Sequence, residues 1–213
     1  MAFDLVQVQQ IFPVPLMTFA VTDAAALNAR LVDEIAARRA AEPGLARSNH
    51  LGWHSAPDLF DRREPATREL ARQLGAMMIA ATHRVAPQQD ISPLALHADG
   101  WINVNPPGAY NDPHSHVGSF WSGCYYVAMP DDPDESSGAI EFIDAGTRLA
   151  SNLIKAPLTA DKVRVQPKVG SVLLFPSTIK HWVHPNRGNA DRVTIAFNGW
   201  FKPKQPLQWG AAQ

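Results

Sequence analysis

The sequence contains a single cysteine, Cys124, among 213 residues, so no disulfide can form within the chain. This favours a protein that works in a reducing compartment. No apolar run approaches the roughly 20 residues that a membrane-spanning helix needs. The N-terminus carries Asp4 where a signal peptide would have a basic region followed by an apolar segment. We therefore expect a cytoplasmic protein without a membrane anchor.

A large excess of charge of one sign is also missing. The chain has 19 Lys and Arg against 20 Asp and Glu, for a formal net charge of -1. Nucleic acids and anionic lipid surfaces are bound by dense basic patches, and no such cluster occurs here. We therefore expect neither a nucleic acid nor a membrane as a partner. The sequence leaves the oligomeric state open, a homodimer included.

What the chain does contain is enough apolar sequence for one well-filled core, because 46% of its residues are hydrophobic. We predict a single domain over residues 1–213. Its parts would be an N-terminal arm with packing helices (1–93), a jelly-roll core (94–204) and a tail (205–213).

Two segments of the first part have helical character. Leu27, Leu31 and Ile35 recur at helical spacing before Pro43, which ends the segment. A second helix is predicted from about residue 65 to 85. Residues 48–60 show no clear period and are expected to form a loop.

From residue 94 onward, short segments rich in β-branched and aromatic residues alternate with Gly- and Pro-containing turns. These segments are 101–105, 121–129, 139–143, 163–166, 171–175, 181–184 and 192–201. Many short strands predict a mainly β fold, a sandwich or jelly roll with the two helices packed outside.

Three histidines in this part are candidate metal ligands. His114 and His116 are two positions apart in an extended stretch, so their side chains point to the same face. Imidazole nitrogens bind Zn, Fe, Cu or Ni, and a catalytic site needs a third protein ligand and open positions. His181 is the candidate third ligand. Asp112 could enter the metal shell or orient one of the imidazoles.

The segment after His181 contains the hairpin-type turn sequence Pro185–Asn189. If this turn joins two neighbouring strands symmetrically, His181 pairs with Thr194 and Val183 pairs with Arg192. In the strand that begins at Arg192, period-two alternation then puts every second side chain on the same face as the metal and the others on the opposite face. The first set is Arg192, Thr194 and Ala196, and the second is Val193, Ile195 and Phe197.

An arginine beside a metal in a partly buried cavity needs an anionic partner. For Arg192 that partner is either an Asp of the chain or a bound organic acid, and we favour the bound acid.

Taken together, these motifs resemble those of the iron(II)- and 2-oxoglutarate-dependent oxygenases, and within them a small bacterial group with an HxH…H metal motif. The likeness covers about residues 97 to 200. It is carried by Trp101 and Asn103; Tyr110, Asn111, His114 and His116; Ser122, Gly123, Tyr125, Tyr126 and Val127; Phe175, Pro176 and Ser177; His181; and Arg192, Thr194, Phe197 and Asn198.

The resemblance implies a double-stranded β-helix, an Fe(II)- and 2-oxoglutarate-dependent dioxygenase activity with O2, and a hydroxylase reaction on an unidentified small-molecule or protein substrate. It implies that the three histidines hold Fe(II) and that no further catalytic residue is needed. Arg192, Thr194 and Tyr126 would hold the far carboxylate of 2-oxoglutarate, and Asn103 its near end. His116 departs from the family, because most members carry a carboxylate there.

Other readings of the same residues stay open. The spacings Gly108 to His114 and Pro176 to His181 also resemble the two cupin motifs, so a three-histidine metal dioxygenase without 2-oxoglutarate is the main alternative. A jelly-roll binding module without enzymatic activity is a third. Within the sequence, His97 with Asp99 forms a competing HxD pair, and His184 competes with His181.

Overall fold

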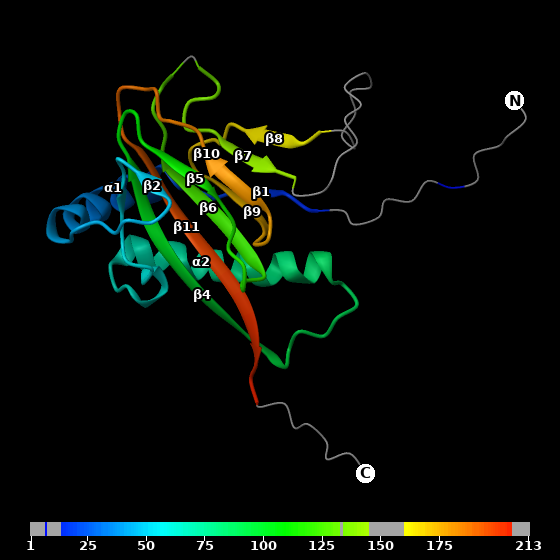
Figure 1. Cartoon of the computed structure of the whole chain (residues 1–213). Coiled ribbons are helices and arrows are strands. Elements are labelled where there is room, and N and C mark those ends of the chain that lie inside the picture. Colours follow the sequence, from blue (N-terminus) through cyan, green and yellow to red (C-terminus); the bar gives the residue numbers. More distant parts are fainter. Residues whose placement is uncertain (1–6, 8–13, 133, 145–159, 206–213) are drawn as a thin grey trace, which may run out of the picture.

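A computed structural model of the chain describes residues 7, 14–132, 134–144 and 160–205. Within them lie the helices α1 (Ala24–Ala41) and α2 (Pro65–Val85), and a 3₁₀ helix at Leu59–Asp61. All other regular elements are strands of two antiparallel sheets (Figure 1). The predicted mainly β fold with two N-terminal helices is confirmed, whereas the division of residues 1–213 into one domain with three parts stays a prediction.

The larger sheet has six strands and the smaller has five. In the order in which they pair, the larger sheet contains β1 (Met17–Ala20), β9 (Ser171–Pro176), β6 (Trp121–Ala128), β11 (Arg192–Pro203), β4 (Leu94–Asn105) and β3 (Trp53–His54). The smaller contains β2 (Asn49–His50), β5 (Tyr110–His114), β10 (Lys180–Val183), β7 (Ile140–Ile143) and β8 (Lys162–Val165).

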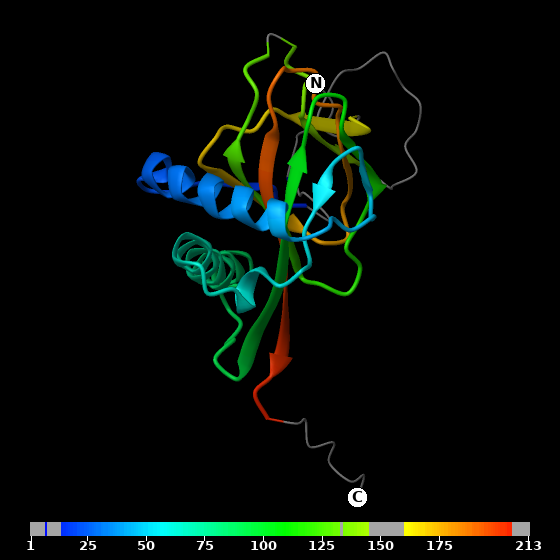
Figure 2. The same cartoon turned by 90° about the vertical axis from the view of Figure 1, so that its left-hand side faces the viewer.

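Both helices pack on the same face of the larger sheet, and α1 crosses in front of the strands when the molecule is seen from that side (Figure 2). Leu31 of α1, Leu74 of α2 and Ile195 of β11 are buried in one hydrophobic cluster. Helical spacing of the apolar residues supplies this contact stripe. Both helices end before a proline, Pro43 and Pro87, which cannot continue a helix.

The opposite face of the larger sheet looks toward the smaller sheet. A second, smaller hydrophobic cluster joins the two sheets there, with Leu173 and Phe175 of β9 packed on Ile140 and Phe142 of β7. β11 therefore has two different environments. Val193, Ile195 and Phe197 belong to the helix-facing core, and Arg192, Thr194 and Ala196 line a cavity between the sheets.

Two local predictions were wrong. The turn at residues 185–189 does not close a hairpin, because β10 pairs with β5 and β7 of the smaller sheet while β11 pairs with β4 and β6 of the larger one. The turn instead carries the chain from one sheet to the other. The segment 48–60 is also more ordered than a loop, since β2 and β3 pair with β5 and β4. No helix in the described part of the chain has the apolar character needed to cross a membrane.

Candidate metal and acid-binding site

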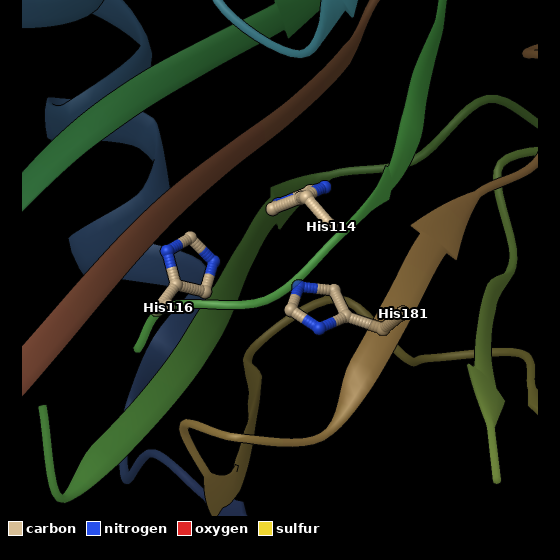
Figure 3. A group of neighbouring side chains, drawn as sticks. All are labelled: His114, His116 and His181. Atoms are coloured by element: carbon tan, nitrogen blue, oxygen red, sulfur yellow. The ribbon is translucent and has the colours of Figure 1, made fainter. Parts of the chain in front are cut away.

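The three predicted histidines come together at one end of the cavity. His114 is the last residue of β5 and lies directly opposite His181 on β10. His116 lies just beyond β5, where its backbone N–H donates to Ser177 O at 2.9 Å. Their rings border a common space (Figure 3), and the nitrogens that could bind a metal all lie within 4.8 Å of one another. Sequence reasoning placed His116 in the strand, but the two side chains converge nevertheless.

Hydrogen bonds orient two of these rings. His114 Nδ1 donates to the Asp112 carbonyl at 2.6 Å, and His181 Nδ1 donates to the Ile179 carbonyl at 3.0 Å. In the tautomer that these bonds require, each Nε2 carries a free lone pair, which is the form that binds a metal. The Asp112 side chain takes neither predicted role, because its carboxylate is bound to His50 Nε2 at 2.5 Å. The main-chain carbonyl of Asp112 orients the imidazole instead.

Burial also keeps two of the rings uncharged. Burial, together with the neighbouring His114, lowers the pKa of His116 to about 4 and that of His181 to about 3. Neutral imidazoles do not repel a cation and need not lose a proton to bind it. The three residues therefore fit a divalent transition metal, with imidazole as its only protein ligand type. Among the described residues, no Asp or Glu lines the cavity.

Arg192 lies at the inner end of the same cavity and is only 2% exposed. Its Nε donates to the Gly138 carbonyl at 2.9 Å and its Nη1 donates to Thr194 Oγ1 at 3.3 Å. No carboxylate among the described residues forms an ion pair with it. The alternative of an internal Asp partner is therefore not seen among the described residues, and a buried guanidinium without a counter-charge is costly.

Two further polar groups face the cavity without a partner. The Tyr126 hydroxyl and Asn103 Oδ1 are buried and have no hydrogen-bond partner among the described residues. The Tyr126 ring lies 5.4 Å from Arg192 Cζ, and burial raises the pKa of its hydroxyl, which stays a donor. Unpaired buried donors and acceptors are rare in folded proteins. They mark where a polar ligand would complete the hydrogen bonding.

The cavity has a volume of about 460 Å³, within the range of small-molecule sites. Its wall includes all seven residues predicted to bind the metal or the cosubstrate: His114, His116, His181, Arg192, Thr194, Tyr126 and Asn103.

The competing residues lie elsewhere. His97 stacks on Trp200, Asp99 accepts a hydrogen bond from Asn198, and His184 binds the buried Glu141 carboxylate at 3.3 Å. None of the three lines the cavity in the described part of the chain.

Sequence reasoning missed Gly138 as a residue of the site. Its φ of 63° lies in the left-handed region, its carbonyl accepts the Arg192 hydrogen bond, and an added Cβ would lie 2.9 Å from Arg192 Cδ. Glycine alone fits this position without strain. The Gly in a Pro- and Asp-rich turn was the available signal, but it did not reveal the contact with a residue 54 positions away.

The chain resembles proteins of known family in sequence and in fold. Residues 99–198 match the model of the family described as "Putative 2OG-Fe(II) oxygenase", where 2OG is 2-oxoglutarate. The matched segment begins within β4 and ends within β11, and so contains the three histidines and Arg192. No curated protein sequence matches the chain.

Solved structures agree on the fold. A prolyl-4-hydroxylase from Pseudomonas putida has a TM-score of 0.58 at 18% identity, covering 89% of this chain and 93% of its own. HygX from Streptomyces hygroscopicus, solved with nickel, 2-oxoglutarate and hygromycin B, has a TM-score of 0.61 at 15% identity, with coverage of 92% and 86%. A prolyl hydroxylase from Trichoplax adhaerens has a TM-score of 0.61 at 13% identity, with coverage of 87% and 83%. The predicted jelly roll is confirmed.

Proposed function

We propose that this chain, whose residues 99–198 match the family model of the 2OG-Fe(II) oxygenases, is a member of that family and an Fe(II)- and 2-oxoglutarate-dependent dioxygenase that hydroxylates its substrate. His114, His116 and His181 would hold Fe(II), and Arg192, Thr194 and Tyr126 would hold the far carboxylate of 2-oxoglutarate. When bound, the metal with 2-oxoglutarate supplies the oxidising power for reaction with O2.

The observation that carries this proposal is the buried Arg192 guanidinium, which shares one cavity with the three histidines and has no carboxylate partner among the described residues. Its Nη2 makes no hydrogen bond to those residues, whereas Nε and Nη1 are held in place. A dicarboxylic acid that reaches from the metal to Arg192 would supply the missing counter-charge. The Tyr126 hydroxyl is the second donor for the same carboxylate.

The chain's residues have three tasks in this scheme. Thr194 accepts from Arg192 Nη1 and so fixes the plane of the guanidinium. Asn103, on β4 opposite Thr194, offers an amide to the near end of 2-oxoglutarate. Ile140, Phe175 and Val183 add apolar cavity wall, which excludes water from the bound acid.

Titration of anaerobic Fe(II)-loaded protein with 2-oxoglutarate tests the proposal. Chelation of the metal by the keto acid gives a visible charge-transfer band, and we expect that band to appear and saturate. Under air, iron-dependent formation of succinate should follow. A protein that binds Fe(II) but develops no band at any 2-oxoglutarate concentration would contradict the assignment.

One observation favours a second candidate. The cavity offers three histidines and, among the described residues, no carboxylate ligand, and this is the ligand set of the cupin-type dioxygenases that do not use 2-oxoglutarate. The same titration separates the two functions, because this alternative predicts oxygen consumption without the band. Arg192 has no role in it.

The remaining proposals concern the cellular compartment and the oligomeric state. The single cysteine supports a reducing cytoplasm as the compartment. Treatment of the native protein with a thiol reagent, with and without reductant, would report whether Cys124 is kept reduced. The homodimer stays a prediction for which light scattering is the measurement.

A further inference from the structure

The cavity has an outer end that the proposed iron and 2-oxoglutarate sites do not use. We define it by five lining residues: Arg47, Ser48, His54, Pro57 and Trp101. Four of them belong to the segment between α1 and α2, and Trp101 belongs to β4. Arg47 is exposed at the surface, whereas Arg192 at the inner end is buried.

Arg47 is the permanently charged side chain of this outer end. Its guanidinium forms no ion pair and no hydrogen bond among the described residues. Asp112 is connected to the same stretch, since its backbone N–H donates to Ser48 O at 2.9 Å. The Asp112 carboxylate is held by His50, however, whose ring stacks on Tyr110 at 4.4 Å. The charge of Arg47 is therefore left for a ligand.

The backbone around Arg47 is anchored by its own hydrogen bonds. The Arg47 N–H donates to Asn49 Oδ1 at 2.8 Å, and Asn49 Nδ2 donates to Gly52 O at 2.7 Å. The Leu45 N–H donates to His54 O at 2.8 Å, which closes the segment on itself. The backbone position of Arg47 beside the cavity is thus fixed, so no ordering of the segment is needed when its side chain binds a ligand.

A flat aromatic wall runs from this mouth to the proposed metal site. Trp101 stacks on His54 with ring centroids 5.4 Å apart and an angle of 13°, and its ring lies 5.6 Å from that of His116. His54 Nδ1 is bound to Ser55 O at 2.7 Å, which fixes the ring. Burial lowers the pKa of His54, and the charge of Arg47 acts in the same direction, so the wall itself stays neutral.

We propose that the outer end is the site of the primary substrate, and that this substrate is a small carboxylic acid with a flat apolar body. Its carboxylate binds Arg47, and its body lies on Trp101 beside His116. The inference rests on the proposed function for the identity of the reaction, but the acid-binding site is a property of the outer end alone.

The charge distribution sets the selectivity of this site. Two arginines and no carboxylate line the cavity in the described part of the chain. Arg192 would bind the carboxylate of one organic acid, and Arg47 at the other end would bind the carboxylate of a second. Amines would meet an uncompensated positive field, and a neutral amide would leave the guanidinium unpaired. The volume of about 460 Å³ is shared with 2-oxoglutarate, which restricts the substrate to a small molecule.

Calorimetric titration of anaerobic Fe(II)-loaded protein tests the site without turnover. The first titration uses 2-oxoglutarate and reports on the proposed function. With 2-oxoglutarate then saturating, indole-3-acetate, phenylacetate and benzoate are titrated, each against its primary amide. We expect at least one acid to bind about tenfold more tightly than its amide, because the bond to a charged group is lost in the amide.

Arg47→Gln should remove the preference for the acid, and Arg47→Lys should keep part of it. Arg72→Gln provides the matched control, since Arg72 is an exposed arginine of α2 outside the cavity. Equal affinities in all three pairs, or a preference that survives Arg47→Gln, would overturn the proposal. If 2-oxoglutarate itself fails to bind, the proposed function fails instead. The acid titrations are then repeated on Arg192→Met protein, where they still decide the role of Arg47.

Discussion

The two ends of the cavity contain the same chemical group in opposite settings. At the inner end, the Arg192 guanidinium is buried and held by the Gly138 carbonyl and the Thr194 hydroxyl. At the outer end, the Arg47 guanidinium is exposed and makes no contact of this kind among the described residues. Burial of a charge without a counter-ion costs free energy at the inner end, whereas the outer guanidinium stays hydrated by water.

This difference in burial shows how one cavity can bind two acids with different affinities. A buried, oriented guanidinium binds one carboxylate geometry tightly. An exposed guanidinium on a hydrogen-bonded segment binds less tightly, because water competes for it and salt screens it. The inner end therefore suits a cosubstrate that is always the same molecule. The outer end suits a substrate that must exchange at every turnover.

The largest expected effect comes from the site between the two ends. His181→Ala removes an imidazole that lies opposite His114, and we expect iron-dependent succinate formation to fall by at least about 100-fold. His97→Ala is the matched control, since His97 stacks on Trp200 outside the cavity. Metal analysis after reconstitution should show loss of stoichiometric iron in His181→Ala alone. Full turnover in this variant would remove His181 from the proposed site.

Next in size is the inner arginine. Arg192→Met keeps an unbranched apolar stem and removes the guanidinium, so the apparent KM for 2-oxoglutarate should rise by about 30- to 100-fold. Steady-state succinate formation at varied 2-oxoglutarate measures this. Arg164→Met is a suitable control, because Arg164 pairs with Glu141 and does not line the cavity. An unchanged KM in Arg192→Met would favour the dioxygenase that does not use 2-oxoglutarate.

A smaller effect separates two neighbouring tyrosines. Tyr126→Phe removes a hydroxyl without a protein partner, so 2-oxoglutarate affinity should fall by about three- to tenfold with no loss of stability. Tyr125→Phe breaks a buried bond to Asn28 Oδ1 on α1, and should destabilise the fold by about 1 kcal/mol while leaving that affinity unchanged. Denaturant unfolding and calorimetry measure the two quantities. If Tyr125→Phe lowered the affinity and Tyr126→Phe lowered the stability, Tyr125 and not Tyr126 would be the residue that binds 2-oxoglutarate.

The smallest effect concerns the backbone that presents Arg47. Asn49→Ala removes the acceptor for the Arg47 N–H and the donor to Gly52 O, two bonds worth about 1 kcal/mol each at most in a partly exposed segment. We expect faster amide hydrogen exchange between residues 45 and 54, with 2-oxoglutarate affinity unaltered. Exchange rates equal to those of the parent protein would mean that the strand pairings of β2 and β3 alone hold the segment.

The inner end could be predicted from sequence because it is made of strands. Alternation with period two assigned Arg192, Thr194 and Ala196 to the cavity face of β11 and Val193 and Ile195 to the helix-facing core, as the structure has them. Phe197, assigned to the helix-facing side, belongs to that core and also lines the cavity. The predicted pairing of β11 with β10 was wrong. Pro185–Asn189 has the residues of a hairpin turn, but the same residue types also occur where the chain passes from one sheet to the other, as it does here. Local turn chemistry does not say which sheet the next strand joins.

The outer end could not be predicted in the same way. Arg47, His54 and Pro57 lie in a segment without a period, and their place at the cavity depends on the two-residue strands β2 and β3. A strand of two residues is too short for an alternation of apolar and polar side chains to be recognised in the sequence. Tyr126 and Asn103 were found only through the family resemblance, since an unpaired buried hydroxyl looks like any core tyrosine until its surroundings are known.

β11 packs against α1 and α2 through one face and forms the cavity through the other. A substitution that repacks the helix layer around Ile195 would therefore also shift the guanidinium three residues before it. We therefore expect substitutions in the half of the pocket built on this strand to be tolerated less well than substitutions in the segment between the helices. New substrate preferences would then arise by exchange of that segment, with the oxidising machinery inherited intact.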